Sequence, residues 1–255
     1  MSSANETSYE VDTNGLQIAP DMVQFTCIRH DIALHNMASL ALQERHKDIK
    51  GTPEYERLRM LMYIDPNLRN PALVDPNGLR TSVKYGLNTK FLGSPLLRSL
   101  QTTMQLIGNG GNSFDPSNKP VISRYMRERF ADHRFQCEFY SDAAISEAMR
   151  GALDFSKIDL TQDDTCYNTD EDVRKALVGE FKATQFKNLA RELLQYLEHK
   201  EGDNKPVINS FILSGHANLF KELFKMLRFS IDEHVQHGKP YTFLVPKSLL
   251  VEIAH

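Results

Sequence analysis

The chain has 255 residues, of which 25% are charged, and its formal net charge is −3. This charge argues against nucleic acid as the main partner, because binding along a phosphate backbone needs a basic face. The length is compatible with one α/β domain that has a sizeable core. Residues 1–20 are polar and acidic and lack the apolar run of a signal peptide or membrane anchor. We therefore expect a disordered tail over residues 1–20, a single domain over residues 21–255 and no membrane association.

The three cysteines, Cys27, Cys137 and Cys166, show neither the paired spacing of a metal site nor a disulfide framework. An odd number of cysteines without a secretion signal indicates reduced thiols and a cytoplasmic or nuclear location. The motifs described below contain no histidine, cysteine or aspartate cluster of the metal-binding kind, so no metal or other cofactor is expected.

The first structural unit begins with an apolar run over residues 23–28 that contains β-branched and aromatic residues, which predicts a buried strand. The run stops at Arg29 and His30, and a helix is expected over residues 34–45. Ligands of α/β folds bind at the C-terminal ends of strands, and a helix N-terminus favours an anion there. This unit therefore predicts a phosphate site, the alternative being a solvated turn.

Two later units have the same order. Ser94 and Pro95 follow a predicted strand, and Arg98 lies one turn inside the helix that Pro95 can begin. Residues 207–213 predict another buried strand, which ends in Ser214-Gly215-His216-Ala217-Asn218 before the next helix. A second histidine at the exit of a strand makes a site shared with the first unit more probable than an isolated structural histidine.

These motifs resemble those of the histidine phosphatase superfamily, the phosphoglycerate-mutase-like fold. That family opens with a strand, Arg-His and an Asn seven positions after the Arg, as Arg29, His30 and Asn36 do here. Its second motif, Ser-Pro-Leu-x-Arg-Ala-x-Gln-Thr-Ala, is similar to residues 94–103. The sequence from His216 to Asn218 is similar to its His-Gly-Asn form. The resemblance implies a three-layer α/β/α sandwich with a mostly parallel central sheet.

The resemblance also implies a chemistry. His30 would be the nucleophile that forms a phosphohistidine, with its second ring nitrogen bonded to a backbone carbonyl. Arg29 and Arg98 would bind the phosphoryl oxygens through their forked donors, and a protonated His216 would add a further cationic donor. The neutral donors that bind phosphate would be Asn36 and Asn218. Because the arginines neutralise the phosphate charge, no metal is required.

The general acid is assigned from a third, shorter motif. The family places Leu-x-Glu after its third strand, with a Gly four residues later, and Glu147 and Gly151 fit this spacing after a strand expected over residues 135–140. Glu147 would protonate the leaving group and then deprotonate the attacking water. Two alternatives remain: Asp142 could act instead, or Glu147 could pair with Arg150 at the surface.

The favoured function is a metal-independent phosphomonoester hydrolase acting on a small phosphorylated substrate or a phosphoprotein. A phosphomutase is less consistent with this sequence, because the acidic segment over residues 153–172 contains only one basic residue, Lys157. Asp31 stands where the family has a small residue, and we expect its carboxylate to point away from the phosphate or to pair with Arg29. The competing interpretation is an inactive phosphate-binding or scaffold protein on the same fold.

The remaining segments are expected to complete the sandwich. Residues 172–199 predict a long helix from the spacing of their apolar residues, and residues 241–245 and 249–253 predict two closing strands. The arginine-rich run that begins at Arg124 could contact an anion, but we favour a solvated amphipathic helix there.

Overall fold

The computed structural model describes residues 18–55, 57, 88–108, 118–128, 146–158, 171–198, 207–231 and 234–255, and the structural statements below concern these residues. Three expected segments lie outside them: residues 1–17 of the tail expected over residues 1–20, the strand over residues 135–140 and most of the acidic segment before residue 171. Among the described helices, none is long and apolar enough to cross a membrane.

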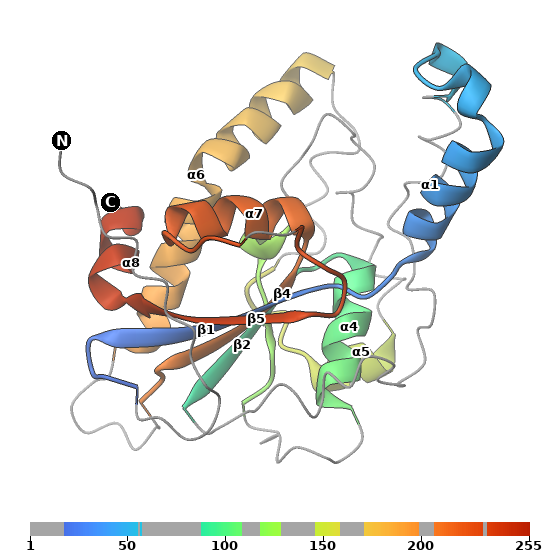
Figure 1. Cartoon of the computed structure of the whole chain (residues 1–255). Helices are drawn as coiled ribbons and strands as arrows, with labels where there is room; N and C mark the ends of the chain where they lie inside the picture. The colour runs from blue at the N-terminus through green and yellow to red at the C-terminus, as the bar shows by residue number, and fades with distance from the viewer. Residues whose placement is uncertain are drawn as a thin grey trace, which may run out of the picture.

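The centre of the structure is a five-stranded sheet with the order β3-β2-β4-β1-β5 (Figure 1). Neighbours among the first four strands are parallel, and β5 runs antiparallel to β1. The strands are β1 (Met22–Arg29), β2 (Thr89–Gly93), β3 (Val121–Ile122), β4 (Ser210–Gly215) and β5 (Pro240–Pro246). This mixed, mostly parallel sheet confirms the predicted α/β class.

Helices cover both faces of the sheet, which gives the expected three layers (Figure 1). On one face lie α6 (Glu171–Leu197), α7 (Ala217–Met226) and α8 (Lys247–Ala254), and on the other α4 (Leu97–Ile107) and α5 (Glu147–Ala152). The first helix, α1 (Leu34–Arg45), leads away from the sheet and is followed by the short helix η1 (Lys47–Ile49). A single 3-10 turn, η2 (Arg124–Met126), follows β3.

The two cores follow from the alternation of side chains along each strand. Phe25 and Phe211 stack with ring centroids 5.5 Å apart and pack with the apolar residues of α6, α7 and α8. Their neighbours in sequence point the other way, so that Ile212 packs with Phe91 and with Leu106 of α4. Because successive strand residues face opposite sides, a buried strand in the middle of three layers must be apolar throughout.

The structure corrects two of the predicted elements. The segment 249–253, predicted to be a strand, lies in α8, where Leu249, Leu250 and Ala254 have helical spacing and are buried. The arginine-rich run is not a solvated helix in its described part, because Arg127 is 5% exposed and follows the turn η2. Both errors arose because short apolar or basic runs do not distinguish a helix from a strand or a turn.

Candidate active site

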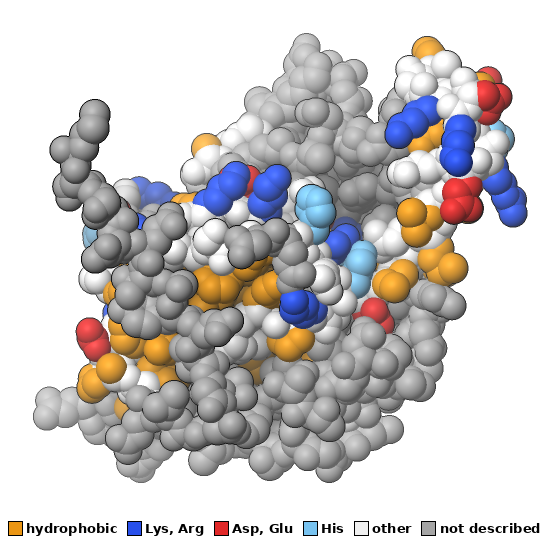
Figure 2. All heavy atoms as spheres, viewed as in Figure 1, with side chains coloured by type: hydrophobic (Ala, Val, Ile, Leu, Met, Phe, Trp, Pro, Cys, Tyr) orange, Lys and Arg blue, Asp and Glu red, His pale blue; other side chains and the backbone are white. Residues whose placement is uncertain are grey.

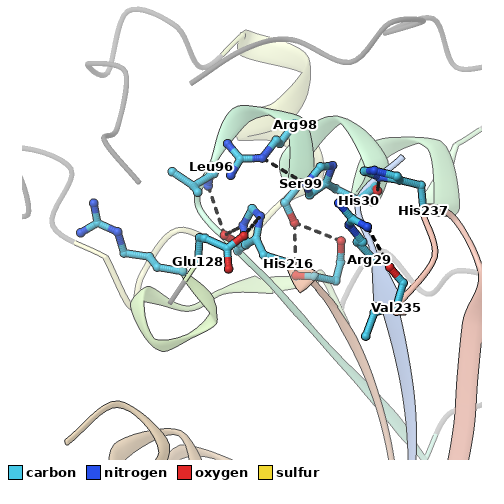
Figure 3. Close-up of polar contacts among 12 residues, drawn as sticks. Arg29, His30, Leu96, Arg98, Ser99, Glu128, His216, Val235 and His237 are labelled. Atoms are coloured by element: carbon cyan, nitrogen blue, oxygen red, sulfur yellow. Dashed lines mark hydrogen bonds and ion pairs between the residues drawn. The ribbon is translucent and has the colours of Figure 1, made fainter. Parts of the chain in front are cut away.

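The polar side chains predicted from three separate motifs meet at one edge of the sheet. Because β1, β2 and β4 are parallel, the residues that follow them emerge at the same edge. Arg29, His30, Arg98 and His216 lie together there (Figure 3), and we call these four residues the His–Arg cluster. Figure 2 shows histidine and basic side chains gathered near the middle of one face, between α7 and the base of α1.

His30 is held at both ring nitrogens. Its Nδ1 lies 2.7 Å from the backbone carbonyl oxygen of Asp31, and the Nε of Arg98 donates to its Nε2 at 3.2 Å. A carbonyl can only accept and a guanidinium N–H can only donate, so both contacts require a proton on Nδ1 and a lone pair on Nε2. The lone pair of Nε2 therefore points toward Arg98 at the centre of the cluster.

The surroundings of His30 keep it uncharged. The side chain is 2% exposed, and burial holds its pKa well below the usual value of 6.5. The positive charges of Arg98 and Arg29 and the nearby rings of His216 and His237 lower the pKa further. A neutral imidazole beside two arginines combines an electron pair on Nε2 with positively charged surroundings.

His216 comes from the exit of β4 and is fully buried. Its ring centroid lies 5.1 Å from that of His30, and its Nε2 lies 2.8 Å from the Oγ of Ser94. The preceding Gly215 lets the chain pass closely under α7, because a Cβ there would come within 3.0 Å of the Leu219 side chain. Close packing of β4 against α7 thus fixes the depth at which His216 enters the cluster.

The two arginines differ in their settings. Arg98 is on the first turn of α4 and is 1% exposed, whereas Arg29 is half-buried and its Nη1 donates to the carbonyl oxygen of Val235 at 2.8 Å. Burial lowers the pKa of Arg29, and the carboxylate of Glu128 opposes that shift. Two guanidinium groups that converge on one edge can bind a small oxyanion from two directions.

Glu128 is a carboxylate of the site that the sequence analysis did not identify. It follows η2, is 6% exposed, and places Oε2 at 3.8 Å from the Nδ1 of His216 (Figure 3). The signal that could have found it is the pair Val121 and Ile122, an apolar run too short to be recognised as a strand. If β3 had been recognised, Glu128 would have been seen to follow the exit of a strand, as the residues of the His–Arg cluster do.

Glu147 is the general acid expected from the third sequence motif. It begins α5 on the opposite face from α7, its side chain is exposed, and among the described residues no hydrogen bond or ion pair joins it to the His–Arg cluster. The strand expected over residues 135–140, on which the third motif depends, lies outside the described residues, so the assignment of Glu147 as general acid stays a prediction. The alternative acid, Asp142, lies outside the described residues.

The two predicted asparagines take positions at helix starts. The Oδ1 of Asn36 accepts a hydrogen bond from the backbone N–H of Ala33 at 3.0 Å, which stabilises the beginning of α1. Asn218 is exposed in the first turn of α7. Within the described part of the chain, neither side chain makes a hydrogen bond to the cluster. Their assignment as phosphate ligands stays a prediction.

Asp31 is the departure from the family pattern. Its Oδ1 accepts a hydrogen bond from the backbone N–H of Ile32 at 2.7 Å, and its charge raises the pKa of His237. The charges that shift the pKa of His30 and Arg29 do not include this carboxylate. The expectations that this carboxylate points away from the phosphate or pairs with Arg29 stay predictions.

His237 is a second residue that the sequence did not reveal. It precedes β5, and because β5 runs antiparallel, its N-terminal end reaches the edge where the parallel strands finish. The Nδ1 of His237 lies 2.8 Å from the backbone carbonyl oxygen of His30, and the two rings are 5.2 Å apart. Burial and the charge of Arg29 lower the pKa of His237. A neutral His237 donates to that carbonyl and steadies the backbone of His30.

The arrangement has the properties of an oxyanion site. In the described part of the chain, no group of three or more histidine, cysteine or acidic side chains is arranged to hold a metal ion. The cluster instead combines two guanidinium groups, a neutral imidazole with a defined lone pair and one nearby carboxylate. These are the components that transfer of a phosphoryl group needs: anion donors, a nucleophile and a proton donor.

No protein-family model matches this sequence, and no curated protein matches it. The solved structures that are similar to this chain include two phosphatases. A phosphoserine phosphatase from Entamoeba histolytica, in complex with 3-phosphoglyceric acid, is 17% identical with a TM-score of 0.37, over 86% of this chain and 89% of its own. The ecdysone phosphate phosphatase of Bombix mori, in complex with tungstate, is 12% identical with a TM-score of 0.45, over 87% of each chain. Similarity this low does not identify the activity of this chain, so we draw its function from its own side chains.

Proposed function

We propose that this protein is a phosphomonoester hydrolase in which His30 accepts the phosphoryl group. The observation that carries the proposal is the fixed tautomer of His30, with Nδ1 donating to the carbonyl of Asp31 and the lone pair of Nε2 directed at Arg98. A phosphate monoester is an anion, and a neutral nucleophile approaches it without charge repulsion. The lowered pKa of His30 keeps the imidazole neutral at physiological pH.

In the first step, Nε2 of His30 attacks phosphorus and the bond from phosphorus to the leaving oxygen breaks. The phosphoryl oxygens take over the donors of Arg98, which frees the Nε2 lone pair that Arg98 contacts in the unliganded site. Arg29 binds the same oxygens, and a protonated His216 would add a donor as negative charge spreads over them. Each such donor is typically worth about 3–4 kcal/mol of transition-state stabilisation.

The leaving alkoxide needs a proton, and we assign Glu128, with its carboxyl group protonated when the ester binds, as the donor. Its carboxyl group lies at the cluster, 3.8 Å from His216, whereas Glu147 is exposed at the start of α5. In the second step Glu128 takes a proton from water, the water oxygen attacks phosphorus, and the bond between phosphorus and Nε2 of His30 breaks. Inorganic phosphate leaves, and both residues return to their starting protonation states.

Turnover of an aryl phosphate tests the proposal. The intact protein should hydrolyse it without added metal and with no change on addition of a chelator, because Arg29 and Arg98 supply the positive charge. His30→Ala should abolish turnover, because it removes the imidazole that accepts the phosphoryl group. The matched control is His234→Ala, which removes an exposed histidine and should leave the rate unchanged.

The intermediate provides a second readout. Protein quenched during turnover of labelled substrate should carry phosphate that is stable in base and lost in acid, and His30→Ala should carry none. Label on a serine, aspartate or cysteine would reject the mechanism. An intact protein that binds phosphate without turning over either aryl or alkyl phosphates would instead establish the non-catalytic alternative.

A further inference from the structure

The turn before Glu128 is connected to the long helix α6 by hydrogen bonds from two buried side chains of that helix. The Nε2 of Gln185 donates to the carbonyl oxygen of Tyr125 at 2.9 Å and to that of Arg127 at 3.0 Å. Two helical turns farther along α6, the carboxylate of Glu192 accepts a hydrogen bond from the Oγ of Ser123. Both contacts reach η2 and the residues beside it from the same face of α6.

The assignment of the Gln185 amide follows from chemistry alone. Both partners are backbone carbonyl oxygens, which only accept, so the atom that faces them must be the amide nitrogen. The side chain is fully buried, and its Oε1 has no hydrogen-bond partner among the described residues. Burying an amide whose oxygen is unsatisfied is unfavourable. Only the two hydrogens of the Gln185 side chain are used, and both are directed at the turn.

The position of these contacts relates Gln185 to catalysis. The carbonyl of Arg127 belongs to the peptide group whose nitrogen is that of Glu128, so the contact at 3.0 Å fixes the plane from which the Glu128 side chain departs. The contact with Tyr125 fixes the turn one step earlier. At the start of the turn, the Oγ of Ser123 accepts from the Tyr125 N–H at 3.2 Å while it donates to Glu192.

We propose that Gln185 is a positioning residue for the proton donor: through the backbone of Arg127 it sets the distance between the Glu128 carboxyl group and the leaving oxygen. The inference rests on the proposed function, because it concerns proton transfer by Glu128 at the same site. It concerns only the steps in which Glu128 moves a proton. Gln185 touches neither the substrate nor His30, and binding of the phosphoryl group by Arg29 and Arg98 is independent of it.

The test compares two substrates in Gln185→Leu. Leucine is similar in size but has no donor, so both carbonyls lose their partner and the turn is free to shift. Hydrolysis of an alkyl phosphate, whose leaving group needs a proton, should fall by roughly 100-fold, the usual effect of misplacing a catalytic group by about 1 Å. The kcat/KM of an activated aryl phosphate, which reports phosphorylation of His30 and not the later attack by water, should change less than about threefold, because its leaving group needs no proton from the enzyme.

The matched control is Gln195→Leu, the same substitution at an exposed position of the same helix, which should leave both rates unchanged. The double variant Gln185→Leu with Glu128→Gln separates positioning from a general structural defect. Once Glu128 has lost its acid function, removing Gln185 should cause no further loss on the alkyl phosphate. Independent effects that multiply would contradict the inference.

A milder variant covers the case in which Gln185→Leu does not fold. Gln185→Asn keeps the amide but shortens the side chain by one methylene, so its nitrogen cannot reach both carbonyls. A fall of roughly tenfold on the alkyl phosphate alone is the supporting result. Equal losses on both substrates, in whichever variant folds, would overturn the inference while leaving the phosphatase proposal intact. If the unsubstituted protein turned over neither substrate, the proposed function itself would fail, and the positioning role would fall with it.

Discussion

At the scale of single residues, the site depends on a small number of side chains whose roles are set by burial. His30 and Glu128 are both almost inaccessible to solvent, at 2% and 6% exposure, yet they belong to different strand exits. Burial and the two arginines lower the pKa of His30 and keep it neutral. The charge of Glu128 has the opposite effect on Arg29, whose pKa it raises. His30 and Glu128 therefore cannot exchange roles. Each role can be tested by a substitution that keeps the size of the side chain.

Glu128→Gln should slow hydrolysis of alkyl phosphates by roughly 10²–10⁴-fold, the usual contribution of a general acid. The amide has the size of the carboxyl group but cannot give up a proton. Aryl phosphates, which leave as stable anions, should be phosphorylated onto His30 at nearly the normal rate. The measurement is kcat/KM for a matched pair of alkyl and aryl substrates.

Glu147→Gln is the comparison that decides between the two glutamates. Because Glu147 is exposed on α5, its replacement should alter neither rate. A selective loss on alkyl phosphates in Glu147→Gln, with none in Glu128→Gln, would return the acid function to the residue indicated by the sequence motif.

At the scale of secondary-structure elements, the depth of the site is fixed by the packing of β4 against α7 and η2. A Cβ on Gly215 would lie 3.0 Å from the Leu219 side chain, 3.1 Å from Phe220 and 3.3 Å from Met126. These contacts involve one residue of η2 and two of α7, so an added methyl group has no open direction. The residue after this glycine is His216, and any shift of β4 against α7 moves its ring.

Gly215→Ala should therefore destabilise the fold by about 1–3 kcal/mol, as overpacking in a core does, and should also lower kcat/KM through displacement of His216. Gly151→Ala is the control, since a Cβ there meets nothing within 4 Å in the described structure. In a helix such as α5, this change should raise stability by roughly 0.5–1 kcal/mol and leave activity unchanged. Urea denaturation and aryl phosphate turnover measure both effects, and a neutral Gly215→Ala would contradict the packing argument.

Most of these helices and strands could be predicted from local sequence patterns. The bounds of α1 and the position of α6 agree with the expected helices, because apolar spacing and the flanking turns are local signals. The strand β5 was also expected near its observed range. The strand expected over residues 249–253 was wrong because Leu249, Leu250 and Ile253 suit either element, and only packing of α8 against α6 decides between them.

The candidate site was predicted in part for the same reason. Arg29, His30, Arg98 and His216 follow recognisable strands, and the rule that parallel strands place ligands at one edge brings them together. Glu128 and His237 depend on information that is not local. Glu128 follows a strand of only two residues, and His237 reaches the site only because β5 is antiparallel, which a sequence pattern does not state.

At the scale of the whole molecule, burial of the histidines links stability to pH. The folded protein holds His30 and His237 with pKa values below 6.5, whereas an unfolded chain binds protons on both near that pH. The unfolded state therefore binds more protons as the pH falls below 6.5, and the free energy of unfolding decreases. Each buried histidine that stays neutral lowers the free energy of unfolding by at most about 1.4 kcal/mol per pH unit in this range. The half-buried His237 lowers it by less.

This dependence should be visible as a fall in the urea midpoint between pH 7 and pH values below 6.5. The contribution of His30 is the difference between the intact protein and His30→Asn, which has no group that titrates there. His234→Asn, at an exposed position, should keep the full dependence. An identical pH slope in all three proteins would show that His30 does not carry a lowered pKa in the folded state.

The order of strands in the sheet also has a consequence for how the protein is made. β1 lies in the interior of the sheet, and both of its neighbours, β4 and β5, are synthesised late in the chain. The hydroxyl groups of Thr26 and Thr242, 3.0 Å apart across β1 and β5, are separated by 216 residues along the chain. At translation rates of about 5–20 residues per second, β1 emerges from the ribosome roughly 10–40 s before its last partner. During that interval the apolar strand β1 has neither of its neighbours to pair with, so the nascent chain exposes an unpaired hydrophobic strand.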